Sequence, residues 1–253
     1  MLWWFAVAHA AVALACLAWL AFDAAPVLGV HPAHKPLKFG LSIAVFLAAM
    51  AYLVPTLACG GGVARALAWT LALTMALEMA PILIQAIRGV PSHFNTRAPL
   101  DAGLWRLMLI AIVIATFTVL GIAVLATVRP LRAGDGGAIA PLLATAWRVG
   151  LWFFVLAAFT GFRMGGQGRH SVGGDDGGPG LRLVNWSVAH GDLRIAHFVG
   201  LHALQALPLI ALALGRAPVG APARWAGLIA AIAAHLAVGG WTLLRALAGR
   251  PPW

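Results

Sequence analysis

The chain has 253 residues, of which 62% are apolar and only 9% are charged. A soluble domain is about 45–50% apolar and about 25% charged, so this chain cannot cover a core with a polar surface. The composition excludes a soluble enzyme, a disordered tail and a disulfide-stapled secreted domain, and it predicts an all-α polytopic membrane protein. The net charge of +10 comes from basic residues that lie between apolar runs, where they contact lipid headgroups and set orientation. We therefore expect no nucleic-acid partner.

Seven apolar stretches are each long enough to cross the ~30 Å hydrocarbon layer as a helix of about 20 residues. Backbone groups in lipid must be satisfied within their own segment, so these stretches should be helices and not strands. No Lys or Arg precedes the apolar core of the first stretch, which we interpret as a span and not as a signal peptide. We expect a single transmembrane domain with helices over residues 3–22, 38–58, 64–87, 104–128, 141–163, 195–215 and 225–247.

The loops on the two sides of this predicted bundle differ in charge. Those on the side of the C-terminus carry about twice as many Lys and Arg residues as those on the other side. The positive-inside rule then places the N-terminus outside and the C-terminus in the cytoplasm, and we expect the cytoplasmic (inner) membrane of a bacterium. A Gly-rich loop over residues 164–194 would lie on the cytoplasmic face.

Polar residues within the third span lie along one side of the predicted helix. At 100° per residue, four of them, together with one proline, fall within an arc of about 80°. Glu78, at the middle of this span, is the only glutamate in the chain. An ionisable group in a membrane span usually faces the bundle interior and marks a pathway or a site. The five residues are Thr74, Glu78, Pro81, Gln85 and Arg88.

The second and sixth spans carry similar polar stripes, and that of the sixth is densest near the predicted cytoplasmic end. On the sixth span the stripe covers an arc of about 140°, and the loops between the spans add further polar residues. Three stripes that converge on one side predict a polar cavity lined by His, Glu and Arg and open to the cytoplasm. The stripes consist of Lys38, Ser42, Tyr52 and Thr56 on the second span and Arg194, His197, His202, Gln205 and Pro208 on the sixth.

The first functional hypothesis is a membrane enzyme that acts on a lipid-soluble or anionic, membrane-adjacent substrate. Glu78 would be the general acid or base, and His93, Asp192 and His202 are further catalytic candidates. Basic and amide side chains would hold the substrate. The predicted substrate-binding residues are Lys35, Lys38, Ser42, Gln85, Arg88, Asn95, Arg194 and Gln205.

Two cofactors fit the histidine content. Imidazole and carboxylate groups suit Zn or Fe, and the candidate ligands are His93, Asp192, His197 and His202. The spacing of five between the last two separates their rings by about 140°, which is poorer than an i,i+4 pair. Alternatively, His9 and His235 lie at similar depths and could ligate one b-type haem if the terminal helices are neighbours.

A third hypothesis needs no cofactor. Glu78 could be the titrating group of a proton-coupled transporter or channel. A transporter needs a polar route through to the outer face, whereas a catalytic site needs only a dead-end cavity. Few polar residues lie in the outer half of the predicted bundle, which favours the dead end.

Overall fold

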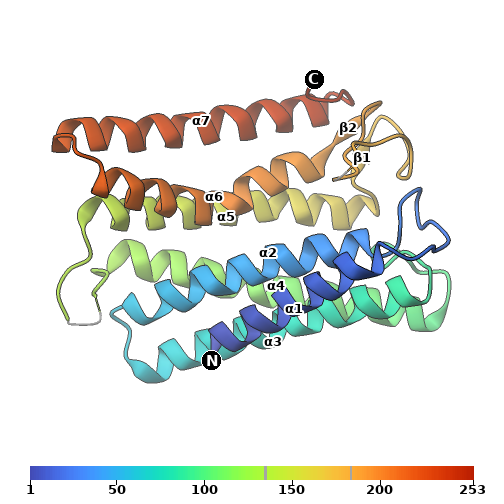
Figure 1. Ribbon diagram of the computed structural model, residues 1–253, viewed down its shortest axis with the longest axis horizontal. Helices are drawn as coiled ribbons and strands as arrows, with labels where there is room; N and C mark the ends of the chain where they lie inside the picture. The colour runs from blue at the N-terminus through green and yellow to red at the C-terminus, as the bar shows by residue number, and fades with distance from the viewer. Residues whose placement is uncertain (134–135, 183) are drawn as a thin grey trace.

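The computed structural model describes residues 1–253 except 134–135 and 183. In the described chain, seven long helices run side by side along the longest axis of the molecule (Figure 1). All seven are long and apolar enough to cross a membrane, which confirms the prediction of an all-α membrane protein. The helices are α1 (Leu2–Trp19), α2 (His34–Leu53), α3 (Gly61–Ile87), α4 (Pro99–Val128), α5 (Pro141–Gln167), α6 (Leu193–Arg216) and α7 (Ala221–Leu247).

Three short elements complete the fold. A 3-10 turn, η1 (Val54–Thr56), extends α2. The strands β1 (Ser171–Val172) and β2 (Gly191–Asp192) pair antiparallel, with Ser171 opposite Asp192. This pairing closes the segment between α5 and α6 into a loop whose two ends lie together.

The observed helix ends differ from the predicted ones where capping residues determine them. Helix α4 begins at Pro99, five residues before the predicted start. Pro at the first helical position and Asp101 in the first turn both favour a helix N-terminus there. Helix α5 continues to Gln167 and ends at Gly168, whose φ of 67° is the left-handed conformation of a C-terminal glycine cap.

The helices pack in two groups that meet at the centre of the bundle. Helices α1 to α4 form one group and α5 to α7 the other, with contacts between α4 and α5 and between α2 and α6 (Figure 1). Helices α5 and α6 approach closely at Gly150, which has no side chain. A Cβ atom added there would lie only 2.9 Å from the Ala203 carbonyl oxygen. Small residues at such crossings are typical of membrane helix pairs.

One end of the bundle carries most of the residues that connect the helices. Helices α1, α3, α5 and α7 end there, and α2, α4 and α6 begin there (Figure 1). We call it the loop-rich end, and it comprises residues 20–33, 88–98, 168–192 and 248–253. Away from this end the fully buried side chains are apolar, among them Leu53, Leu71 and Ile122. Large apolar side chains such as Trp4 and Leu244 are exposed on the outside, where a bilayer would cover them.

Candidate functional site

Glu78 lies inside the bundle and meets the loop that follows its own helix. Its Oε1 is 3.7 Å from Nε2 of His93, and its side chain is only 7% exposed. Helix α3 ends in a turn in which the Val90 N–H donates to the Gln85 carbonyl at 3.0 Å, and the chain beyond this turn brings His93 back to Glu78. Glu78 is nine residues from the end of α3, or about 13 Å along the axis at 1.5 Å per residue. Irregular backbone that reaches inward from the membrane surface has to be enclosed by protein.

Aromatic side chains from three segments surround His93. Its ring centroid lies 5.6 Å from that of Phe39 on α2, 5.9 Å from that of Phe94 and 5.2 Å from that of Trp105 on α4. Its Nδ1 is 3.2 Å from the Ser92 hydroxyl oxygen. Burial lowers the pKa of His93 well below its usual range, and the neighbouring positive charge of Lys35 acts in the same direction. At neutral pH the ring is therefore uncharged, with one nitrogen that donates and one that accepts.

A second polar group lies at the end of α3. The amide of Gln85 donates to the Asp101 carboxylate at 2.9 Å. The Arg88 guanidinium pairs with the same carboxylate and also donates to the Gln85 amide oxygen. In the loop between α3 and α4, the Asn95 side chain donates to the Pro91 carbonyl and accepts from the Arg97 N–H, which stabilises the fold of this loop.

Sequence reasoning missed Asp101 in this group. The predicted fourth helix began at residue 104, which left Asp101 in a loop without a partner. Its position two residues after Pro99 is a helix-start signal that could have brought it into the helix and next to α3.

The four cations predicted to bind an anionic substrate have different surroundings. Arg88 pairs with Asp101, and Arg194 pairs with Asp192 at 2.6 Å. Lys38 donates to the Val184 carbonyl at 2.8 Å, which attaches the loop between α5 and α6 to α2. Only Lys35 makes no hydrogen bond or ion pair with a described residue, and its charge acts on both Glu78 and Arg194. The charge of Lys35 therefore reaches both Glu78 and the Asp192–Arg194 ion pair.

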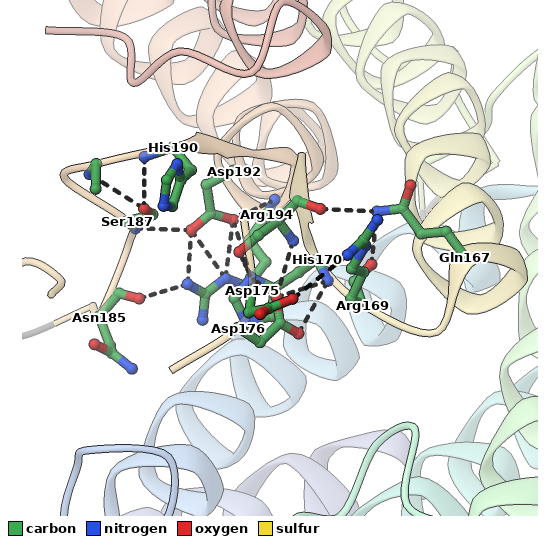
Figure 2. Close-up of polar contacts among 12 residues, drawn as sticks. Gln167, Arg169, His170, Asp175, Asp176, Asn185, Ser187, His190, Asp192 and Arg194 are labelled. Carbon is green, nitrogen blue, oxygen red and sulfur yellow. Dashed lines mark hydrogen bonds and ion pairs between the residues drawn. The ribbon is translucent and has the colours of Figure 1, made fainter. Parts of the chain in front are cut away.

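Asp192 is the N-cap of α6 and holds the preceding loop in place, as Figure 2 shows. Its carboxylate accepts hydrogen bonds from the backbone N–H groups of Ser187 at 2.9 Å and Arg194 at 3.0 Å. The Arg194 guanidinium adds three contacts to the same group and one to the Asn185 carbonyl. Burial opposes ionisation of Asp192, but these hydrogen bonds and the charge of Arg194 outweigh it and lower the pKa.

His170, which sequence reasoning also missed, lies beside this carboxylate. Its Nδ1 is 3.2 Å from an Asp176 oxygen and 3.7 Å from an Asp192 oxygen (Figure 2). Burial and the charge of Arg194 lower the pKa of His170 to about 4, against the attraction of the two carboxylates. The signal in the sequence was a His-Ser pair five residues before Asp-Asp within the Gly-rich loop, where a turn can bring them together.

The structure does not bring the four predicted metal ligands together. His197 lies against α5, with Nδ1 2.7 Å from the Ala157 carbonyl oxygen. His202 faces α2 instead, with Nε2 3.0 Å from the Ser42 hydroxyl oxygen, while Asp192 pairs with Arg194 and His93 lies beside Glu78. Among the described residues, no group of three or more His, Cys, Asp or Glu side chains is arranged to hold a metal ion.

The two predicted haem ligands lie on different sides of the bundle. Helix α1 packs against α2 and α3, whereas α7 packs against α6 and α5 and forms the opposite edge (Figure 1). His9 is buried, with Nδ1 2.7 Å from the Phe5 carbonyl oxygen of its own helix. Nδ1 of His235 is likewise 3.3 Å from the Ala231 carbonyl oxygen. These contacts provide no shared pocket for a haem.

The polar stripes of α3 and α6 face different neighbours. Thr74, Glu78, Pro81 and Gln85 are buried, so the stripe of α3 points inward as predicted. Gln205 of α6 is buried too, and its amide oxygen has no hydrogen-bond partner among the described residues. Helix α3 packs against α4, α2 and α1, and α6 against α5, α7 and α2, so α2 lies between the two stripes. The stripes of α3 and α6 therefore do not meet directly, against the prediction.

Comparison of the chain with protein-family models, with curated proteins and with solved structures finds no match.

Proposed function

We propose that the protein is an integral membrane enzyme in which Glu78 and His93 transfer a proton to or from a lipid-soluble substrate. The observation that carries this proposal is the enclosed pair itself: a carboxyl group and a neutral imidazole 3.7 Å apart inside an apolar bundle. Burying a carboxylate among apolar helices is costly, and such residues usually serve a function. General acid–base catalysis uses these two side chains more than any others.

The free atoms of the pair suit proton transfer. Oε2 of Glu78 is buried and has no hydrogen-bond partner among the described residues, so it is free to take up a proton from a substrate or to give one to it. Oε1 faces Nε2 of His93 at a distance longer than a hydrogen bond, which can shorten when a substrate binds. A substrate O–H or C–H proton would pass to Glu78, and the neutral His93 would relay it onward or return it.

The surroundings indicate the class of substrate. Phe39, Phe94 and Trp105 give the pair an apolar wall, which favours a substrate that dissolves in lipid. The charge of Lys35 acts directly on Glu78 and would stabilise negative charge that develops on a substrate as its proton leaves.

The side chains on the far side of Glu78 favour an enzyme over a transporter. Buried threonines in that direction donate to carbonyls of their own helices, as Thr74 does to Thr70 and Thr116 to Ile112. The large, fully buried residues there, such as Met50 and Leu53, are apolar. Among the described residues beyond Glu78, α3 carries no further buried ionisable side chain, which favours a dead-end site.

Solvent deuterium can test this proposal even though the substrate is unidentified. Purified protein in vesicles of bacterial total lipid would be incubated in D2O, and the lipids and small molecules would be analysed by mass spectrometry. We expect some compounds to gain deuterium with the wild-type protein but not with Glu78→Gln or His93→Gln. Asp175→Asn is the matched control, because the Asp175 side chain is 100% exposed, and it should label like wild type.

Two results would count against the enzyme. Equal labelling by wild type and Glu78→Gln would remove the role of the carboxylate. No labelling with any protein, together with proton uptake into the vesicles that Glu78→Gln abolishes, would favour the proton-coupled transporter instead.

A further inference from the structure

A cleft with a volume of about 960 Å³ opens at the loop-rich end, between the loop that precedes α2 and the loop between α5 and α6. Its size is at the upper end of the range of about 300–1,000 Å³ that is typical of ligand pockets. His31 and His34 line one wall, and residues 177–180, Arg182 and Asn185 line the other. None of the catalytic residues proposed above contributes to this lining.

The chemistry of the cleft favours an anion. No described Asp or Glu side chain contributes to its lining. Arg182 is exposed and has no ion pair or hydrogen bond with a described residue, so its charge is available. On the opposite wall, neither ring nitrogen of His34 has a hydrogen-bond partner among the described residues. Nδ1 is buried, which leaves Nε2 to meet a ligand, and Lys38 adds positive charge nearby. An anion bound between the two walls can accept hydrogen bonds from the Arg182 guanidinium on one side and from the His34 ring on the other.

Backbone donors add to this arrangement. Within the described chain, the N–H groups of Gly177 and Gly178 donate to no protein acceptor. Gly177 has a φ of 97° and lies against Leu28 of the opposite loop, so a side chain there would strain the turn. His34 is the first residue of α2, a helix of 20 residues whose N-terminus carries partial positive charge. Phosphate oxygens match such a set of donors.

Apolar side chains that adjoin the cleft form its rim: Leu181 lines it, Leu28 packs against Gly177, and the Phe22 carbonyl oxygen is 2.9 Å from Nε2 of His31. Phe22, Leu28 and Leu181 are 68%, 49% and 38% exposed. They lie in loops at one end of the bundle, where membrane helices meet the headgroup region. A ligand with a phosphate headgroup and an acyl chain would satisfy both the donors inside the cleft and the apolar rim.

We propose that this cleft binds the phosphate group of an anionic phospholipid, with Arg182, His34 and the amides of Gly177 and Gly178 as donors. The site is independent of proton transfer at Glu78, and either proposal can fail without the other. A soluble phosphate ester has the same headgroup chemistry, so the test has to separate the two sources.

The experiment is a titration of the purified full-length protein in detergent, followed by calorimetry. The probes are dioctanoyl phosphatidic acid, dioctanoyl phosphatidylcholine, glycerol 3-phosphate and inorganic phosphate. The variants are Arg182→Gln and His34→Gln. Arg250→Gln is the matched control, because Arg250 is an exposed arginine at the same end whose side chain has no described partner. Arg182 is also exposed, so its replacement should not disturb folding.

We expect phosphatidic acid to bind more tightly than phosphatidylcholine, and Arg182→Gln to weaken its binding about tenfold, as the loss of one charged hydrogen bond would. His34→Gln should weaken it as well, and Arg250→Gln should leave it unchanged. Equally tight, Arg182-dependent binding of glycerol 3-phosphate or inorganic phosphate would support the phosphate site but overturn the lipid as its source. The same affinity in Arg182→Gln and Arg250→Gln would overturn the site.

Discussion

Replacing Asp192 with Asn should release the loop between α5 and α6 while the helices stay in place. Asp192 is 1% exposed and accepts two backbone N–H groups as well as the Arg194 guanidinium. Asn has nearly the same shape but no charge, and its NH2 group would face donors where one carboxylate oxygen now accepts. Arg194 would then remain partly buried without a counter-ion.

The expected magnitude follows from burial. Breaking a buried ion pair by removing one partner costs about 3–5 kcal/mol. The Arg194 side chain is 26% exposed, so water can solvate part of its charge in the variant. We therefore expect a cost at the lower end of this range, about 3 kcal/mol. Each 1.4 kcal/mol is about a factor of ten, which makes local opening of the loop roughly a hundredfold more frequent.

Hydrogen–deuterium exchange read by mass spectrometry measures this opening directly. Peptides that cover residues 168–192 should exchange roughly a hundredfold faster in Asp192→Asn than in wild type, and peptides from the centre of α3 should not change. Asp175→Asn lies in the same loop but changes a fully exposed carboxylate, so it should behave like wild type. If the two variants exchanged at the same rate, Asp192 would not be the anchor of this loop.

Two further perturbations test the surroundings of the site. The pKa of His170 is about 4 in the folded protein against an ordinary value of 6.5. The unfolded chain therefore binds the extra proton first, and exchange protection of residues 168–192 should fall as the pH drops from 6.5 towards 4. In His170→Gln this loss of protection at low pH should be smaller. If His170→Gln kept the wild-type pH profile, His170 would not be the group responsible. Gly150→Ala places a Cβ atom 2.9 Å from backbone atoms of α6, so it should lower the stability measured in a thermal melt by about 1–3 kcal/mol. Gly121→Ala, which has open space around it, should leave the stability unchanged. Equal melting of the two variants would mean that α5 and α6 are not in close contact at Gly150.

The seven helices could be predicted from the sequence because each apolar run is a local property of the chain. Their ends depended on single capping residues such as Pro99 and Gly168, which a hydropathy window averages out. The inward direction of the α3 stripe was also predictable, since polar residues in a span avoid lipid. Thr74, Glu78 and Gln85 are all buried.

The partners of these residues could not be predicted, because they depend on how the helices pack. Helical periodicity gives a face but no neighbour, so nothing in the sequence indicated that α2 lies between α3 and α6. The contact of His93 with Glu78 requires the loop after α3 to fold back, which is a matter of backbone conformation at residues such as Phe94, with its φ of 58°. The approach of His170 to Asp192 depends on closure of a long Gly-rich loop.

The enclosed Glu78–His93 pair is the central claim, and the composition of the chain allows it to be tested at one site. Glu78 is the only glutamate, so glutamate labelled with 13C at its side-chain carboxyl gives a single side-chain carboxyl signal. With 15N-labelled histidine in the same protein, dipolar coupling to a ring nitrogen weakens this signal only when an imidazole lies close to it. In solid-state NMR of the protein in lipid, we predict a short-range dipolar coupling between the Glu78 carboxyl carbon and one histidine ring nitrogen, which His93→Gln abolishes. A carboxyl signal without this coupling, or a coupling that survives in His93→Gln, would contradict the account.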